Sequence, residues 1–409
     1  MKNLYFISGS KKLGKFLAQL FFLLFITHSY GQVKEEFKPR TSRYSPSQTI
    51  YNLNGDFTII GNTNLTLQNY SDTKDNSLNT MISVDEDKES ETLNSSSATL
   101  KFSNENKAEA KCSNVVFAGL YWTARTANDV KTSSKREVKF RTPHGGYQTI
   151  TANSSDIAYP GENGMYVAYA EVTDQVRDGG AGKYWVADMA LSTGNGGTTG
   201  YYGGWSLIVV YENPKMNPRD ITVFDGYAYV EGNKIKNYDL PVSGFNTVQN
   251  GPVNMKLGIV AGEGDTGIRG DYFKIKKHGT NDWVSLNHSD NFQNNFFNSS
   301  ILTEGERDPQ LVNNTGIDIS MFNIPNANNS VITNNQTSTT FRYGSTQDTY
   351  IIFSLAMSVD AYQPKIEGKS SVVSIDGVPY SSKMKIEPGK NVTYKVELRN
   401  NGTEDLQNV

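Results

Sequence analysis

The segment from Gly203 to Gly226, GGWSLIVVYENPKMNPRDITVFDG, constrains the fold more than any other part of this chain. Its apolar run, Trp205 to Tyr211, is too short for a helix and rich in β-branched residues, which predicts a strand buried on both faces. Two Asn-Pro pairs follow and indicate a turn, and Ile221 and Val223 begin a return strand. The sequence therefore predicts a β-hairpin inside a packed sheet at the centre of the protein.

Short apolar or alternating segments recur along the chain, with turn signals about every 8–12 residues. They include Phe57–Leu67, Ala98–Phe102, Val115–Trp122, Met165–Val172 and Thr349–Val359. Helical periodicity is scarce, and short helices are expected only within 294–301 and 316–322. This pattern predicts an all-β protein, built as a large antiparallel, jelly-roll-like β-sandwich.

The N-terminus has the pattern of an export signal. Four lysines precede a short apolar run, Phe16 to Ile26, and Ser29-Tyr30-Gly31 supplies a small-residue cleavage site. The run is much shorter than the ~20 residues that cross a bilayer, and no other stretch could span one. We therefore expect a signal peptide over residues 1–31, an exposed leader over 32–49, and a protein secreted to the outer surface of the cell.

The net charge limits the classes of partner that the protein can bind, and the cysteine content limits its disulfides. Loss of residues 1–31 removes four lysines and no acids, so the net charge falls from −3 to −7. An acidic surface disfavours nucleic acid and anionic lipid as partners. The single cysteine, Cys112, has no partner for an internal disulfide and is expected to be a buried small hydrophobe.

A boundary is expected near Gln363-Pro364. The large sandwich would occupy residues 50–363, and residues 364–409 read as a separate β unit with strict alternation from Val392 to Leu398. About 45 residues of β sequence rarely fold alone without staples, so the chain is expected to be part of a longer protein.

The second unit, IEPGKNVTYKVELRNNGTEDLQNV at Ile386–Val409, resembles the first part of an immunoglobulin-like repeat of bacterial surface proteins. The large domain resembles the N-terminal module of long exported proteins of the Bacteroidetes type, through VVFAGLYW at Val115–Trp122, GEGDTGIRGD at Gly262–Asp271 and the Gly203–Gly226 segment. The resemblance implies type IX secretion and an adhesin-like role at the cell surface, in some members linked to gliding motility. It supplies no catalytic residues.

The motif GEGDTGIRGD is the strongest candidate site. Glu263, Asp265 and Asp271 lie within nine positions and are separated by glycines, which permit tight turns around a cation. Ca²⁺ takes six to eight oxygen ligands, so these carboxylates predict a Ca²⁺ site. The alternative is a solvated turn in which the acids cap backbone amides. The tripeptide Arg269-Gly270-Asp271 also spells a cell-binding motif, although Asp271 serves the turn in either interpretation.

Aromatic residues beside a glycine-rich loop offer a second candidate. Tyr201, Tyr202 and Trp205 could form a platform on which a sugar stacks, or they could flank a buried strand. Trp122 and Trp185 are interpreted as core because their neighbours are apolar.

The function expected from these features is a non-enzymatic surface adhesin or stalk-tip module. Its partners would be glycans or proteins of another cell or substratum, together with the export and anchoring machinery. A carbohydrate-binding, lectin-like module is the alternative. A secreted hydrolase is a third possibility: His144-Gly145-Gly146 resembles an oxyanion loop, but the chain has no Gly-x-Ser-x-Gly elbow, and carboxylate pairs converge only in space.

Overall fold

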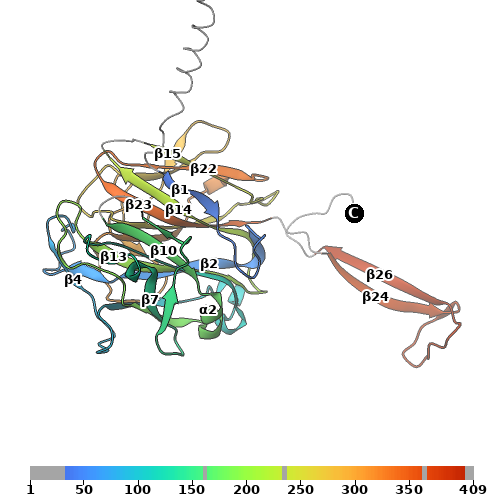
Figure 1. Cartoon of the computed structure of the whole chain (residues 1–409). Coiled ribbons are helices and arrows are strands. Elements are labelled where there is room, and N and C mark those ends of the chain that lie inside the picture. The colour runs from blue at the N-terminus through green and yellow to red at the C-terminus, as the bar shows by residue number, and fades with distance from the viewer. Residues whose placement is uncertain (1–32, 160–163, 233–236, 362–365, 401–409) are drawn as a thin grey trace, which may run out of the picture.

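A computed structural model describes residues 33–159, 164–232, 237–361 and 366–400 (Figure 1). The chain is predominantly β, with several antiparallel sheets, so the predicted all-β sandwich class is confirmed. The predicted signal peptide at 1–31, the boundary at 362–365 and the last nine residues of the second unit lie outside the described residues.

One long, curved sheet runs through the whole body. Its strands follow the order β19 (Ile301–Leu302), β21 (Ile317–Asn323), β16 (Met255–Gly262), β23 (Thr349–Asp360), β14 (Pro218–Glu231), β2 (Tyr51–Thr63), β13 (Tyr202–Glu212), β6 (Asn114–Arg125), β10 (Met165–Glu171) and β9 (Ile157–Ala158). Strand β1 (Val33–Pro39) pairs with β14 beside this path.

Two smaller sheets cover the outer faces of the long one. The first has the order β20 (Arg307–Asp308), β5 (Ser95–Leu100), β11 (Gly182–Ala187), β7 (Glu137–Arg141) and β8 (Gln148–Thr151). The second has the order β15 (Tyr238–Ser243), β22 (Ser338–Gly344), β17 (Tyr272–Lys276) and β18 (Trp283–Ser285). A three-stranded sheet at one end joins β12 (Gly194–Asn195), β4 (Thr80–Ser83) and β3 (Leu65–Leu67).

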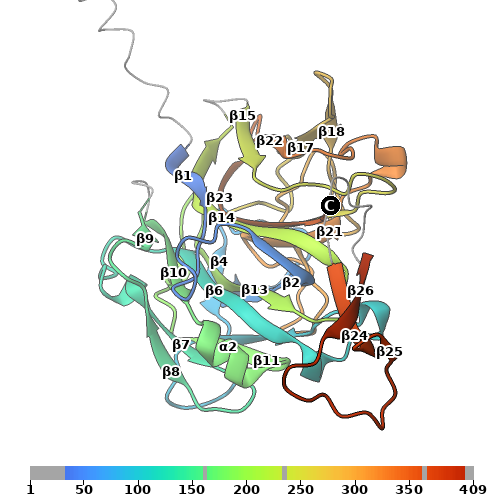
Figure 2. The ribbon, with the colours of Figure 1, turned by 90° about the vertical axis from the view of Figure 1, so that its right-hand side faces the viewer.

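Three hydrophobic cores separate four layers of sheet. One core lies between the β15-containing sheet and β14, β16 and β23, and another lies between the β11-containing sheet and β2, β13, β6 and β10. The third core, with Ile59, Ile208 and Ile319, lies between the two halves of the long sheet. The layers follow one another from top to bottom in Figures 1 and 2. Residues 51–361 therefore form two stacked sandwiches rather than one.

Close approach of the two sandwiches depends on a missing side chain. A Cβ at Gly258 in β16 would lie 2.4 Å from Ile59 Cδ1 and 2.8 Å from a ring carbon of Phe57, both in β2. These separations are shorter than any non-bonded carbon–carbon contact, so an alanine at 258 would require the Ile59 and Phe57 side chains to move.

The predicted central hairpin is wrong in its pairing. β13 is buried along its length as expected, but it pairs with β2 and β6, whereas β14 pairs with β2, β23 and β1. Strand β2 lies between them, and the intervening turn crosses its end, where Asn54 Nδ2 donates to the Met216 carbonyl at 2.8 Å. Local apolar pattern identified the strands but could not identify their neighbours.

The predicted leader has mostly exposed side chains, as expected, but its backbone is paired with the body. Strand β1 joins the edge of the body by pairing with β14, with register shifts that mark bulges. Arg40 follows it and binds Asp225 at 2.5 Å and Asp156 at 3.0 Å, so the start of the chain is anchored to both halves of the long sheet.

The second unit is an extended hairpin. β24 (Ile366–Ile375) pairs with β26 (Val392–Asn400) and with the short β25 (Val378–Pro379). Tyr394, Val396 and Leu398 alternate along β26 and are exposed. The predicted alternation is present, and its apolar side chains are solvent-exposed among the described residues.

The helix and cysteine predictions are wrong. Neither expected segment is helical, and residues 316–322 overlap strand β21. The described residues contain one α-helix, α2 (Thr173–Gly179), and 3₁₀ turns at Glu105–Lys107, Ala110–Cys112, Ser134–Arg136 and Ala327–Asn329. Cys112 is exposed, because it lies in one of these turns. Among the described residues, no helix is both long and apolar enough to cross a bilayer.

Candidate metal centre

Three strand ends meet at one end of the β16 half of the long sheet. β16 ends at Gly262, which pairs with Ile317 at the start of β21 and with Ile351 near the start of β23. Antiparallel pairing thus places the loop after β16 beside the residues that precede β23. The acidic motif lies in this loop.

Three carboxylates converge here. One oxygen from each of Glu263, Asp265 and Asp348 lies within 4.8 Å of the others. The residues are 2%, 4% and 1% exposed, so the cluster is closed to bulk solvent. The structure brings Glu263 and Asp265 together as predicted, but the third member is Asp348.

Asp271 occupies a neighbouring position instead of the triad. Its Oδ2 accepts a hydrogen bond from the Phe297 amide at 2.7 Å, and its side chain is completely buried. The same burial excludes the Arg269-Gly270-Asp271 tripeptide as an accessible cell-binding motif in this conformation. Asp318, at the start of β21, is a fifth buried carboxylate, and its Oδ1 accepts from the Ser300 amide at 3.2 Å.

Several oxygens of the cluster lack hydrogen-bond donors. Among the described residues, Glu263 Oε2, Asp265 Oδ1, Asp271 Oδ1 and Asp318 Oδ2 are buried and have no partner. A buried carboxylate oxygen without a donor or cation is costly, because it has lost its hydration and gained nothing in return. These orphaned oxygens are the atoms of the cluster that could bind a cation or hold a proton.

The pKa values of these acids are displaced in the same direction. Burial, followed by repulsion from Asp265 and Asp348, raises the pKa of Glu263 well above its usual range. Burial raises the pKa of Asp265 to about 8, with repulsion from Asp75 and Asp271 adding to it. The pKa of Asp348 is also raised, mainly by burial. Without a cation, the triad therefore tends to hold protons at neutral pH.

The nearest described cation does not pair with the triad. Arg125 lowers the pKa of Glu263 from a distance, but its Nη1 donates to the carbonyls of Gly196 and Gly200, at 2.7 and 2.6 Å. The guanidinium thus holds the glycine-rich loop. The negative charge of the triad has no salt bridge within the described residues.

Local backbone features shape the cluster. Glu263 has a positive φ of 75°, and its amide donates to the Gly316 carbonyl at 2.7 Å. A Cβ at Gly264 would lie 2.3 Å from the Phe297 carbonyl oxygen and 2.4 Å from Asp318 Oδ2, so only glycine fits. Ser345 Oγ accepts from the Asp348 amide at 2.7 Å and orients the last turn before β23.

The predicted aromatic platform does not form from Tyr202 and Trp205. They are 0% and 1% exposed, and the Trp205 indole N–H donates to Ser96 Oγ at 2.8 Å inside the core. A stacked sugar needs an open ring face, so these two residues cannot supply one. Tyr201 is half-buried, with the Arg125 guanidinium 5.5 Å from its ring centre.

The interpretation of Trp185 as core is also wrong. It is half-exposed on the outer face of β11, whereas Tyr184 and Val186 point into the core. The alternation Tyr184, Val186 was visible in the sequence and would have placed Trp185 on the opposite face.

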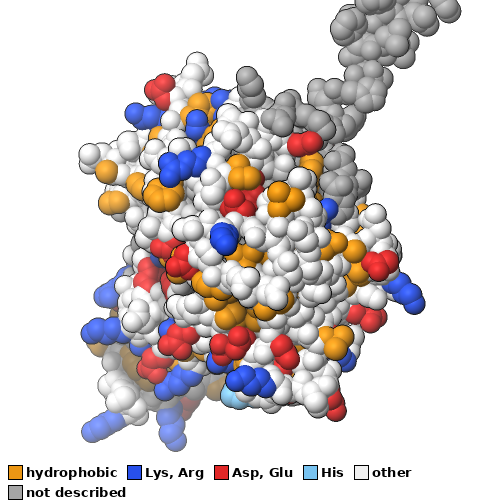
Figure 3. All heavy atoms as spheres, turned by 90° about the vertical axis from the view of Figure 1, so that its left-hand side faces the viewer, with side chains coloured by type: hydrophobic (Ala, Val, Ile, Leu, Met, Phe, Trp, Pro, Cys, Tyr) orange, Lys and Arg blue, Asp and Glu red, His pale blue; other side chains and the backbone are white. Residues whose placement is uncertain are grey.

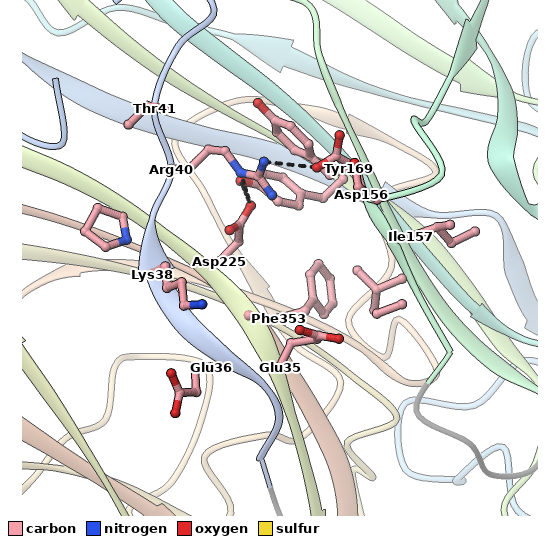
Figure 4. A pocket seen from close by; sticks show the side chains of 16 residues that line it. Glu35, Glu36, Lys38, Arg40, Thr41, Asp156, Ile157, Tyr169, Asp225 and Phe353 are labelled. Atoms are coloured by element: carbon pink, nitrogen blue, oxygen red, sulfur yellow. Dashed lines mark hydrogen bonds and ion pairs between the residues drawn. The ribbon is translucent and has the colours of Figure 1, made fainter. Parts of the chain in front are cut away.

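A second polar cluster of partly buried side chains lies beside a cavity (Figure 4). This cavity of about 370 Å³ is lined by β1, β9, β10 and β14. At one end of it, Arg40 bridges Asp225 and Asp156 and lies 4.1 Å from the Tyr169 ring centre. Burial raises the pKa of Asp225, while Arg40 and the Tyr121 hydroxyl lower it. The charged groups at this end therefore satisfy one another.

The outer surface near the metal centre is mixed in charge. On the face in Figure 3, on the side where β4 lies in Figure 1, acidic and basic side chains lie interspersed among neutral groups. The concentrated negative charge of the region is therefore internal rather than superficial.

Comparisons with known proteins do not assign the chain to a family. No protein-family model and no curated protein match the sequence. Similar solved structures include the major capsid protein P2 of bacteriophage PM2, with 10% identity over 74% of this chain and 97% of that one. They also include PNGase F, a glycosylasparaginase of Flavobacterium meningosepticum, with 11% identity over 74% and 96%. Both have a TM-score of 0.19, at which neither likeness carries an argument.

Proposed function

We propose that this protein is a non-catalytic module of the cell exterior whose fold is stabilised by a bound Ca²⁺ ion. The observation that carries the proposal is the buried triad of Glu263, Asp265 and Asp348, with orphaned oxygens on two of its members. Three ionised carboxylates within 4.8 Å repel one another strongly unless protons or a cation neutralise them. A divalent cation would neutralise most of this charge and join three strand ends.

Calcium fits the triad better than magnesium. Mg²⁺ requires octahedral geometry and keeps several of its waters, whereas Ca²⁺ accepts an irregular set of carboxylate and carbonyl oxygens. The triad is almost closed to solvent, which leaves little space for a hydrated ion. Transition metals prefer nitrogen or sulfur ligands, and this cluster offers oxygens alone.

The extracellular placement is supported by the sequence of the N-terminus and by the resemblance to Bacteroidetes-type surface modules. On this basis we place the protein among adhesin or stalk-tip modules exported by type IX secretion, with roles in surface attachment or gliding motility. Antibody labelling of intact cells tests the placement. Labelling that requires permeabilised cells would contradict it.

Calcium binding is tested on the purified protein after treatment with EDTA and dialysis. Titration calorimetry should show Ca²⁺ binding at least as tight as the about 10⁻⁴–10⁻³ M typical of extracellular modules, and weaker binding of Mg²⁺. Asp348→Asn should weaken Ca²⁺ binding, whereas Asp129→Asn, an exposed acid far from the motif in sequence, is the matched control. Absence of Ca²⁺ binding, or equal binding by Asp348→Asn, would overturn the proposal.

A further inference from the structure

Strand β11 presents an aromatic and basic surface on the outer face of its sheet. Tyr184 and Val186 point into the core, so Lys183 and Trp185 point outward. Trp185 pairs with Arg141 on the neighbouring strand β7. Two cations lie near the tryptophan ring, with the Arg141 Cζ 4.9 Å and the Lys183 Nζ 5.5 Å from its ring centre.

A shallow depression of about 340 Å³ opens at this place. Its lining consists of two cations, an aromatic ring, a proline ring, a hydroxyl group and a glycine: Arg141, Lys183, Trp185, Pro143, Thr142 and Gly145. The lining contains no acidic residue, although acids outnumber bases in the chain as a whole. The depression is thus a basic site on an acidic protein. We refer to it as the Trp185 depression.

The guanidinium of Arg141 is held in position before any ligand arrives. It lies between Trp185 and the ring of Tyr147, whose centre is 4.5 Å from Cζ. The Tyr147 hydroxyl in turn donates to Asp87. Pre-positioning lowers the conformational entropy that a ligand must remove on binding.

The cations of the depression are only partly neutralised. Arg141 uses Nη1 to bind Glu89, which leaves Nε and Nη2 without a described partner. Lys183 lies 3.9 Å from Asp308, at the outer limit of an ion pair, and both side chains are about half exposed. The indole N–H of Trp185 makes no hydrogen bond to a described residue.

A second stacked pair in the molecule shows what a neutralised arrangement looks like. Arg342 lies 3.9 Å from the ring centre of the half-buried Trp283, on the outer sheet of the other sandwich. Its Nε and Nη2 both bind the carboxylate of Asp239, at 2.6 and 2.8 Å. The bidentate pair occupies the edge of the guanidinium that would otherwise bind an anion.

We propose that the Trp185 depression binds an acidic polysaccharide, one that carries carboxylate or sulfate groups on its sugar rings. Trp185 and Pro143 offer apolar surface to the C–H groups of a sugar ring. Arg141 and Lys183 lie at the edge of that surface, where a ring substituent with negative charge would meet them. Carboxylate and sulfate groups would bind these cations in the same way, and the test distinguishes between them.

The proposal rests on the proposed function only in placing the protein outside the cell, where such polymers occur. It requires no cation at the triad. Thermal unfolding with Ca²⁺ and with EDTA, measured on the same variants, keeps the two proposals distinguishable.

The experiment measures binding of the purified protein to polygalacturonate, heparin, neutral dextran and single-stranded poly(dT), by calorimetry in the presence of Ca²⁺. We expect binding to polygalacturonate or heparin, none to dextran, and weaker binding as salt screens the charges. Trp185→Ala, and separately the pair Arg141→Gln with Lys183→Gln, should each weaken it about tenfold or more. Trp283→Ala is the matched control and should bind as the unaltered protein does.

The outcomes are decisive in either direction. The proposal is supported if the variants of the Trp185 depression lose binding to the acidic polysaccharide while their unfolding temperatures stay unchanged. Three results overturn it: no binding to either acidic polysaccharide, equal affinity for poly(dT), or unchanged binding in Trp185→Ala. Preference for polygalacturonate over heparin, or the reverse, identifies the charged group.

Discussion

Two groups of carboxylates in this protein differ in how deeply they are buried and in whether the chain supplies a cation for them. Asp225 and Asp156 share the guanidinium of Arg40, which lies within 2.5 and 3.0 Å of them. The triad of Glu263, Asp265 and Asp348 has no such cation among the described residues, yet it is more deeply buried. The chain itself completes the first group, whereas in our proposal an ion from outside completes the second.

The difference predicts which of the two groups makes the stability of the protein depend on solution conditions. A group neutralised by an internal arginine is insensitive to chelators, because the arginine is part of the chain and stays charged. A triad that depends on Ca²⁺ responds to both chelators and pH, because protons and the cation compete for the same oxygens. The following predictions test this contrast.

The largest effect is expected from Arg40→Met. It leaves Asp225 buried beside a core without its cation, and breaking a buried pair in this way costs about 3–5 kcal/mol. Urea unfolding should show the loss equally with Ca²⁺ and with EDTA. The double variant Arg40→Met with Asp225→Leu should recover part of it, since no unpaired charge remains. A loss that vanishes in Ca²⁺ would contradict the contrast.

Removal of Ca²⁺ comes next. A ligand at 100 times its Kd stabilises the folded state by about 2.7 kcal/mol. At about 2–4 °C per kcal/mol for a large domain, EDTA should lower Tm by about 5–10 °C. Glu263→Gln should lose this difference, and Asp129→Asn should keep it. An unchanged Tm in EDTA would show that no bound cation stabilises the triad.

The next largest effect is the dependence of Tm on pH. The folded-state pKa of Asp265 is raised to about 8 and that of Asp271 to about 7, mainly by burial. Raised folded values mean that protonation favours the folded state, so this stabilisation is present at low pH and is lost as pH rises through about 7–8. In EDTA, Tm should therefore fall between pH 5.5 and 8.5.

With Ca²⁺ the trend should oppose this one. The cation binds the ionised carboxylates, so the rise in Tm that Ca²⁺ produces should grow with pH over the same interval. Measuring Tm at both pH values, with and without Ca²⁺, gives the comparison directly. A Ca²⁺ effect that shrinks with rising pH would argue against carboxylate ligands.

The smallest effects concern two tryptophans. Trp205→Phe removes the buried donor to Ser96 Oγ, which keeps only the bond that it donates to Asn64 Oδ1, and this loss costs about 1–3 kcal/mol. Trp185→Phe changes a half-exposed ring whose N–H has no described partner, so unfolding should shift by less than about 0.5 kcal/mol. Equal losses at the two positions would show that Trp185 is structural.

Part of the metal centre could be read from the motif. Gly262–Asp271 combines acids and glycines, and two of its acids, Glu263 and Asp265, belong to the triad. Asp348 carried no comparable local signal, because GSTQDTY reads as an ordinary polar turn. Asp271 is as close in sequence as the others but turns to the Phe297 amide.

What the sequence determined by itself is local. Apolar alternation and β-branched runs predicted the positions of most of the long strands. The glycines around Glu263 predicted a tight acidic loop. These signals depend on neighbouring residues alone, so they survive without knowledge of the fold.

The tertiary structure decided everything that depends on partners. It inserted β2 between β13 and β14, stacked two sandwiches over a shared core, and brought Asp348 to Asp265 across 83 positions. It also buried Trp205 and left Trp185 half-exposed. The physical reason is that strand pairing and burial are set by long-range packing, whereas a single strand shows only which of its faces is apolar.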